Sequence, residues 1–181
     1  MTVLNAIDPK HATGRTKELF GTLEQALGRV PTMIRIMAQS PSVLETYLHF
    51  NHALEQSTLS PRTRALITVA IAEVNRCDYT LSLGMALGKR QGVADADLKA
   101  ARSGRADDVK TMEALQFATS IVRRAGRVPH AEVDRLRHLG FTDGEIVDII
   151  AAVALNLFRN YFNLVAGTDI DSPVVRTPVS A

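Results

Sequence analysis

One residue of this chain has a side chain suited to nucleophilic or redox chemistry. Cys77 is the single cysteine among 181 residues, so no disulfide can form within the chain. Glu73 lies four residues before it, and Asp78 follows it directly. A thiol reacts as its thiolate, and nearby carboxylates disfavour that charged form. The local sequence therefore favours a packed, weakly reactive thiol, with Arg76 as the nearest cation that could offset the two acids.

Glu73 has two interpretations. It could serve as a base for Cys77, or it could pair with a basic side chain at the end of a helix. Helix-end carboxylates that are partly buried usually have a structural partner, so the second interpretation is favoured.

A metal site is not expected. His49 and His52 are three residues apart on a predicted helix, a spacing that can hold a metal ion. No third ligand follows at a matching distance, so both histidines are predicted to be polar surface residues. No bound cofactor is predicted either.

The composition is that of an ordinary globular protein and excludes several classes of function. Hydrophobic residues make up 46% of the chain and charged residues 22%, while aromatic residues are only 5% and Trp is absent. Such a core suits closely packed helices. The net charge is +2, and the basic residues are scattered, so no nucleic-acid-binding face is predicted. The sequence shows no apolar run of about 20 residues and no signal-peptide pattern, so we expect a cytoplasmic protein without a membrane span.

Hydrophobic periodicity and capping signals predict one all-α domain over residues 1–181. It has a helical body over about 15–167 and an extended tail over 168–181, where two prolines interrupt any helical period. The predicted helices cover about 16–27, a short piece after 31, 41–56, 62–75, 78–91, 97–102, 109–124, a short piece after 129, and 142–164. The helix over 62–75 is nearly all apolar and is predicted to be central.

Several segments resemble one known family in the same order along the chain. They are the Glu-x-Asn-x-Cys-x-Tyr string over 73–79, the Gly-Phe-Thr-Asp-Gly-Glu-Ile string over 140–146, the asparagine-rich segment over 154–163, and 167–173. Over about residues 15–175 the chain resembles the AhpD-like, or carboxymuconolactone decarboxylase-like, family. The resemblance implies an all-α AhpD-like fold, relatives that act as alkyl hydroperoxidases, and assembly as a homo-oligomer.

The resemblance also implies which residues should carry the chemistry. Peroxidase members of the family use a Cys-x-x-Cys-x-x-x-His motif and a relay glutamate on the preceding helix. Here Cys77 keeps the first position, Thr80 replaces the second cysteine and Gly84 replaces the histidine. The glutamate position falls near Ala65. The second thiol and both proton-transfer groups are absent, so dithiol peroxidase activity is predicted to be lost.

Three functional hypotheses remain open. The first is a protein that retains the fold and binds a small molecule, because small residues at these positions predict a mostly apolar pocket beside Cys77 for an apolar ligand. The second is a one-cysteine hydroperoxide reductase, in which an external thiol or another subunit resolves a sulfenic acid on Cys77. The third, decarboxylation of a lactone acid, has the least support, because the segment around Cys77 offers few polar groups to hold a carboxylate.

Overall fold

The computed structural model describes residues 2–178, which form helices and loops and contain no β-strand. The helices are α1 (Gly14–Leu27), α2 (Thr32–Met37), α3 (Pro41–Glu55), α4 (Pro61–Val74), α5 (Asp78–Arg90), α6 (Asp95–Ala101), α7 (Val109–Arg123), α8 (His130–His138) and α9 (Asp143–Ala166), preceded by a 3-10 turn at Pro9–His11. The all-α prediction is confirmed, and the helix limits differ from those predicted by about two residues at most, as at Asp95 and Ala166.

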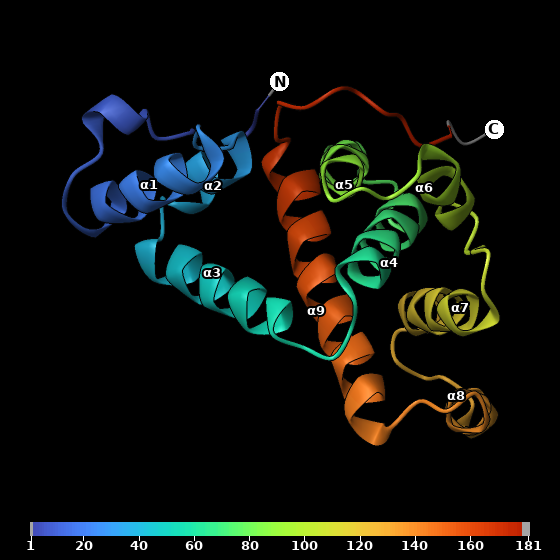
Figure 1. The fold of residues 1–181 in the computed structure, drawn as a ribbon. Helices are drawn as coiled ribbons and strands as arrows, with labels where there is room; N and C mark the ends of the chain where they lie inside the picture. The colour runs from blue at the N-terminus through green and yellow to red at the C-terminus, as the bar shows by residue number, and fades with distance from the viewer. Residues whose placement is uncertain (1, 179–181) are drawn as a thin grey trace.

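The helices are arranged around α9, which runs through the middle of the molecule (Figure 1). Helices α1 to α3 lie on one side of it, and α4 to α8 lie on the other. Helix α4 packs against α5, α6, α7 and α9. Its residues Leu66, Ile67 and 69–72 are all buried. The predicted central position of this helix is therefore confirmed, because an all-round apolar surface requires neighbours on most sides.

Local signals explain where the helices begin and end. Thr142 and Glu145 form the predicted capping box at the start of α9. The hydroxyl of Ser60 accepts a hydrogen bond from the Thr63 N–H at the start of α4. Ser40 makes no such bond at the start of α3, and its hydroxyl lies 3.3 Å from that of Ser42 instead.

Helix α9 is long and apolar enough, by length and composition, to cross a membrane. We expected no apolar segment of about 20 residues, and this helix corrects that expectation. Polar residues interrupt it, but its 18-residue window still has a mean hydropathy of 1.4. Half of that window is buried against the rest of the protein, as is usual for the core helix of a folded domain. The cytoplasmic location stays a prediction.

The tail lies across the beginning of α5 and reaches α6 (Figure 1). Residues 168–178 have no regular secondary structure, and the last residues of the predicted extended tail, 179–181, lie outside the described part. The Asp78 carboxylate accepts hydrogen bonds from the Thr177 N–H and hydroxyl, both at 2.8 Å, and from Arg176 at 2.9 Å. Ser82 exchanges hydrogen bonds with the backbone of Val175. The tail is therefore fixed to α5 by specific contacts.

Candidate functional site

The Cys77 thiol is buried at the start of α5. Cys77 is the N-cap residue of that helix, follows the left-handed residue Arg76 (φ 52°) and is 1% exposed. Its Sγ donates a hydrogen bond to Thr80 Oγ1 at 3.3 Å. Burial raises the pKa of the Cys77 thiol above its ordinary value, and the negative charge of Asp78 adds to the rise. Hydrogen bonds to Thr80 and Tyr79 act in the opposite direction without reversing it, so the thiol is protonated at neutral pH.

A surface depression of about 500 Å³ lies over this thiol. Residues from the start of α5, the end of α9 and the tail line it: Arg76, Cys77, Asp78, Tyr79, Asn163, Leu164, Gly167, Thr168, Asp169, Ile170, Val174 and Arg176. The tail thus forms one wall of the depression beside Cys77.

The Glu73 carboxylate is bound to an arginine. Arg102 donates to it through Nε at 2.8 Å and through Nη2 at 3.3 Å. Arg102 Nη2 also donates to the carbonyl of Arg176 at 2.8 Å. No hydrogen bond described in the structure joins Glu73 to Cys77. The carboxylate has the basic partner that a structural role requires, and it links the end of α4 to the end of α6 and to the tail.

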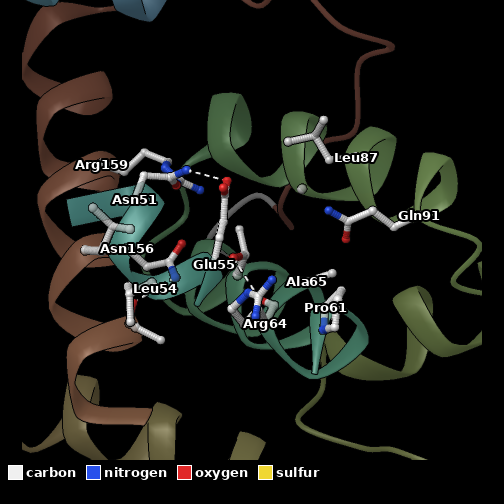
Figure 2. Close-up of a pocket in the computed structure, with 14 residues that line it drawn as sticks. Asn51, Leu54, Glu55, Pro61, Arg64, Ala65, Leu87, Gln91, Asn156 and Arg159 are labelled. Carbon is white, nitrogen blue, oxygen red and sulfur yellow. Dashed lines mark hydrogen bonds between the residues drawn. The ribbon is translucent and has the colours of Figure 1, made fainter. Parts of the chain in front are cut away.

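The other two substituted positions lie in a separate cavity. Ala65 on α4 and Gly84 on α5 both line a cavity of about 160 Å³ between α3, α4, α5 and α9 (Figure 2). Its full lining is Asn51, Leu54, Glu55, Pro61, Arg64, Ala65, Thr68, Gly84, Leu87, Gln91, Ala152, Leu155, Asn156 and Arg159. Cys77 is not part of this lining. The structure therefore brings the glutamate and histidine positions together and leaves the cysteine outside their cavity.

The polar lining of the cavity differs from the prediction. The sequence predicted a mostly apolar pocket beside Cys77, but six lining side chains have amide, carboxylate or guanidinium groups: Asn51, Glu55, Arg64, Gln91, Asn156 and Arg159. Four of the six come from α3 and α9, which are far in sequence from the cysteine segment. The prediction was wrong because it rested on that segment alone.

Arg159 is the most buried charged group of this cavity, with 8% exposure. Its Nε donates to the Tyr47 hydroxyl at 3.1 Å. Its Nη2 donates to Asn51 Oδ1 at 3.2 Å, and both Arg159 and Asn51 are labelled in Figure 2. The Tyr47 ring lies 5.8 Å from the guanidinium carbon. Arg64 donates from Nη1 to the carbonyl of Leu59 at 2.6 Å. Among residues 2–178, neither arginine forms an ion pair with a carboxylate.

Sequence reasoning missed these two arginines as site residues. Asn156, Arg159, Asn160 and Asn163 are spaced at intervals of three and four on α9, and all four are buried. A polar stripe on the buried face of an otherwise apolar helix was the signal that could have pointed to a site, because buried polar groups require partners. Three of these residues, Asn156, Asn160 and Asn163, have side-chain atoms with no hydrogen-bond partner in the described structure.

Gly84 permits close packing of α5 against α4. A Cβ atom at this position would lie 3.2 Å from the Thr68 Cγ2 methyl and 3.4 Å from Val69 Cγ2. Any larger side chain here, including the family's histidine, would require Thr68 to shift.

The two histidines on α3 lie on the surface. His49 and His52 are both exposed, and His52 Nδ1 lies 3.6 Å from Glu55 Oε2. Among the residues that the structure describes, no group of three His, Cys, Asp or Glu side chains could hold a metal ion.

Comparison with solved structures shows the class of fold. A peroxidase-related protein with an alkylhydroperoxidase AhpD core from Ralstonia eutropha JMP134 has a TM-score of 0.85 at 20% identity, covering 94% of this chain and 92% of that one. A peroxidase-related protein from Silicibacter sp. TM1040 has a TM-score of 0.80 at 22% identity, covering 93% and 94%. The debrominase Bmp8 has a TM-score of 0.81 at 19% identity, covering 94% and 93%. At these identities the likeness establishes the AhpD-like fold alone.

The sequence comparison finds a family model that matches part of the chain. Residues 41–119 match the model of the carboxymuconolactone decarboxylase family. Over these residues the chain is similar to that family, and as a whole it has the AhpD-like fold. No curated protein matches it in sequence.

Proposed function

We propose that this protein lacks dithiol hydroperoxidase activity and binds a small organic molecule in the cavity between α3, α4, α5 and α9. The observation that supports the loss of dithiol activity is that the Cys77 thiol is buried and has Thr80 as its side-chain partner. Dithiol chemistry needs a thiolate nucleophile and a second thiol that closes a disulfide. Thr80 can supply no disulfide bond.

The proton-transfer positions support the same conclusion. Ala65 and Gly84 have no group that accepts or donates a proton, and Glu73 is engaged by Arg102. A neutral thiol without an adjacent base is a poor nucleophile. The polar groups at hand are therefore better suited to binding than to peroxide reduction.

The cavity supports the proposed binding of a small organic molecule. Its volume of about 160 Å³ is close to that of an engineered cavity of about 150 Å³ that binds benzene, so it suits a ring-sized molecule. One neighbour in fold, a cysteine-to-alanine variant of the debrominase Bmp8, was solved in complex with 2,3,4-tribromopyrrole. A small ring compound bound to a protein of this fold agrees with the proposed binding role.

A turnover assay tests the loss of peroxidase activity. The protein and its Cys77→Ser variant are mixed with an organic hydroperoxide and a dithiol, and hydroperoxide consumption is followed. We expect both to match the rate of the dithiol alone. Turnover well above that rate, lost in Cys77→Ser, would overturn the proposal.

The second candidate is a one-cysteine hydroperoxide reductase. The observation in its favour is that Cys77 borders the 500 Å³ depression together with Arg76 and Arg176, two cations that would favour a thiolate if the site opened. The thiolate would attack the terminal hydroperoxide oxygen and break the O–O bond, and the released alkoxide would take a proton to become the alcohol. Two external thiols would then reduce the sulfenic acid, giving Cys77, water and a disulfide.

Trapping with a sulfenic-acid probe separates the two candidates. A labelled Cys77 after peroxide treatment, found by mass spectrometry, supports the one-cysteine reductase. An unmodified Cys77 under conditions that oxidise a free thiol supports the binding protein.

Assembly of identical copies is part of the proposal. The outer face of α9 exposes several large apolar side chains: Val147, Ile150, Phe158, Tyr161, Leu164 and Val165. Phe158 continues this face into an apolar groove with Val43, Tyr47 and Phe50 of α3. Contiguous exposed apolar surface of this kind is typical of protein interfaces.

Light scattering coupled to size-exclusion chromatography tests the assembly. We expect the wild type to be larger than a monomer and Val165→Glu, at a position 73% exposed, to be a monomer. Val109→Glu, at an exposed position on α7, is the matched control and should leave the mass unchanged. A monomeric wild type would contradict the proposal.

A further inference from the structure

The cavity of Figure 2 contains two arginines whose positive charges have no acidic partner among residues 2–178. Arg62 and Arg102, whose side chains are more exposed than Arg159, both have such partners: Arg62 pairs with Asp97 and Asp107, and Arg102 pairs with Glu73. A buried charge is unfavourable unless it is paired. Arg159 is 8% exposed, so its lack of a counter-ion calls for an explanation.

The hydrogen bonds of these arginines leave donors for a ligand. Arg159 uses Nε and Nη2 for Tyr47 and Asn51, and its Nη1 makes no hydrogen bond in the described structure. Arg64 uses only Nη1, for the Leu59 carbonyl. Guanidinium groups with remaining donors match the oxygens of a carboxylate.

The one acid of the lining does not neutralise this charge. Glu55 is an exposed residue, and its carboxylate accepts a hydrogen bond from Asn51 at 3.0 Å and lies near His52. Two arginines and one glutamate leave the lining with a net positive charge. The charge of the cavity therefore favours an anion.

Two further features restrict the kind of anion that the cavity can bind. Leu54, Leu87 and Leu155 contribute apolar wall, which suits an organic ring better than inorganic phosphate. Asn156 donates through Nδ2 to the Ala152 carbonyl, but its buried Oδ1 accepts no hydrogen bond. A ligand with a hydroxyl or N–H group would satisfy this acceptor.

We propose that this cavity binds a ring-sized organic carboxylate with a hydrogen-bond donor, the carboxylate pairing with Arg64 and Arg159. The inference rests on the proposed binding function and names its ligand class. Arg64 reaches the cavity from α4 and Arg159 from α9, so the ligand joins two helices that meet in the core (Figure 2).

Calorimetric titration with four probes tests the charge requirement. The probes are 4-hydroxybenzoate, benzoate, the neutral 4-hydroxybenzamide and inorganic phosphate. We expect 4-hydroxybenzoate to bind most tightly, and 4-hydroxybenzamide to bind at least about tenfold more weakly because it lacks the charge. Benzoate should be intermediate, because it leaves Asn156 Oδ1 without a donor. Phosphate should be weakest.

Variants test the assignment to these residues. Arg64→Met should weaken 4-hydroxybenzoate at least about tenfold and leave 4-hydroxybenzamide nearly unchanged. Arg90→Met removes the same charge from an exposed position outside the cavity and should change neither. Arg64 is the preferred position, because Arg159 also supports Tyr47 and Asn51 and its loss could disturb the fold.

The outcomes separate this inference from the proposed function. Equal binding of the amide and the carboxylate, or equal effects of Arg64→Met and Arg90→Met, would overturn the inference and leave small-molecule binding standing. Tightest binding of phosphate would show an inorganic anion site and would also overturn it. Absence of binding by any probe at millimolar concentration overturns the carboxylate inference, whereas thiol-dependent hydroperoxide turnover overturns the proposed function.

Discussion

The thiol of Cys77 and the hydroxyl of Thr80 lie 3.3 Å apart on successive turns at the start of α5, with the thiol donating. The resemblance to the AhpD-like family implies that these positions correspond to the two cysteines of its peroxidase members. Where a disulfide would close in such a relative, a hydrogen bond between two buried side chains is present here. Because Thr80 cannot form a disulfide, this contact supports the proposal that dithiol chemistry is lost.

Cys77 should react slowly with alkylating reagents in the folded protein. Its side chain is 1% exposed and its pKa is raised by burial, so both access and thiolate fraction are low. We expect labelling by iodoacetamide at neutral pH to accelerate by orders of magnitude on denaturation. Fast labelling of the native protein, at the rate of a free thiol, would contradict the buried state.

The same burial makes stability depend on pH. The folded protein holds the Cys77 proton more tightly than the unfolded chain, because the folded pKa is raised. The resulting stabilisation of the folded state is fully present below the pKa of the unfolded chain, about 8.5. It is lost as the pH rises toward the pKa of the folded protein, by up to about 1.4 kcal/mol per pH unit. The difference in unfolding free energy between wild type and Cys77→Ala should therefore shrink between about pH 8.5 and 9.5. A constant difference over this range would argue against the raised pKa.

Asp78→Asn should release the tail from α5. Partial burial raises the pKa of Asp78, but hydrogen bonds from Thr177 and Arg176 outweigh it and lower the pKa overall, which shows that the carboxylate is stabilised in its charged form. Without that charge, we expect faster tryptic cleavage after Arg176 and faster labelling of Cys77. Asp134→Asn, at an exposed site on α8, is the control and should change neither rate. Equal cleavage of both variants would mean that Asp78 does not hold the tail.

The Glu73–Arg102 pair should contribute to stability and not to chemistry. Its side chains are 15% and 27% exposed, so a double-mutant cycle with Glu73→Gln and Arg102→Met should give a coupling energy of about 1 kcal/mol. The more exposed Lys99–Asp95 pair on α6 should give only about 0.3–0.5 kcal/mol. If Glu73→Gln abolished an activity while leaving the unfolding free energy unchanged, a catalytic role would replace the structural one.

Two glycine-to-alanine substitutions should change the free energy of unfolding in opposite directions. At Gly88 on α5, an added Cβ would lie 2.6 Å from Leu98 Cδ2, and Leu98 is fully buried, so Gly88→Ala should destabilise by about 1–3 kcal/mol. At Gly21, within α1, nothing lies within 4 Å of the added atom, and Gly21→Ala should stabilise by up to about 1 kcal/mol. Chemical denaturation measures both, and a stabilising Gly88→Ala would show that α5 and α6 can separate.

The sequence predicted the helices well because their signals are local. The Thr142–Glu145 capping box and the apolar run in α4 lie within a few residues of the structure that they specify. The cavity could not be predicted in this way. Arg159 is hydrogen-bonded to Tyr47, which is 112 positions away, and no local pattern encodes that pairing. The sequence predicts a raised pKa for Cys77 from neighbouring carboxylates, whereas burial is the larger cause of the rise, and the weak reactivity of the thiol stays a prediction.

The N-terminal segment meets the end of α9, where the Val3 N–H donates to the carbonyl of Ala166 at 2.8 Å. A contact that closes nearly the whole chain into one loop has a large entropic cost, so it forms after the helices that bring its partners together. The same contact opens at a low free-energy cost relative to global unfolding, as terminal segments commonly do. A similar local opening of the tail residues that line the depression over Cys77 would let solvent reach the thiol while α4, α7 and the rest of the core stay folded.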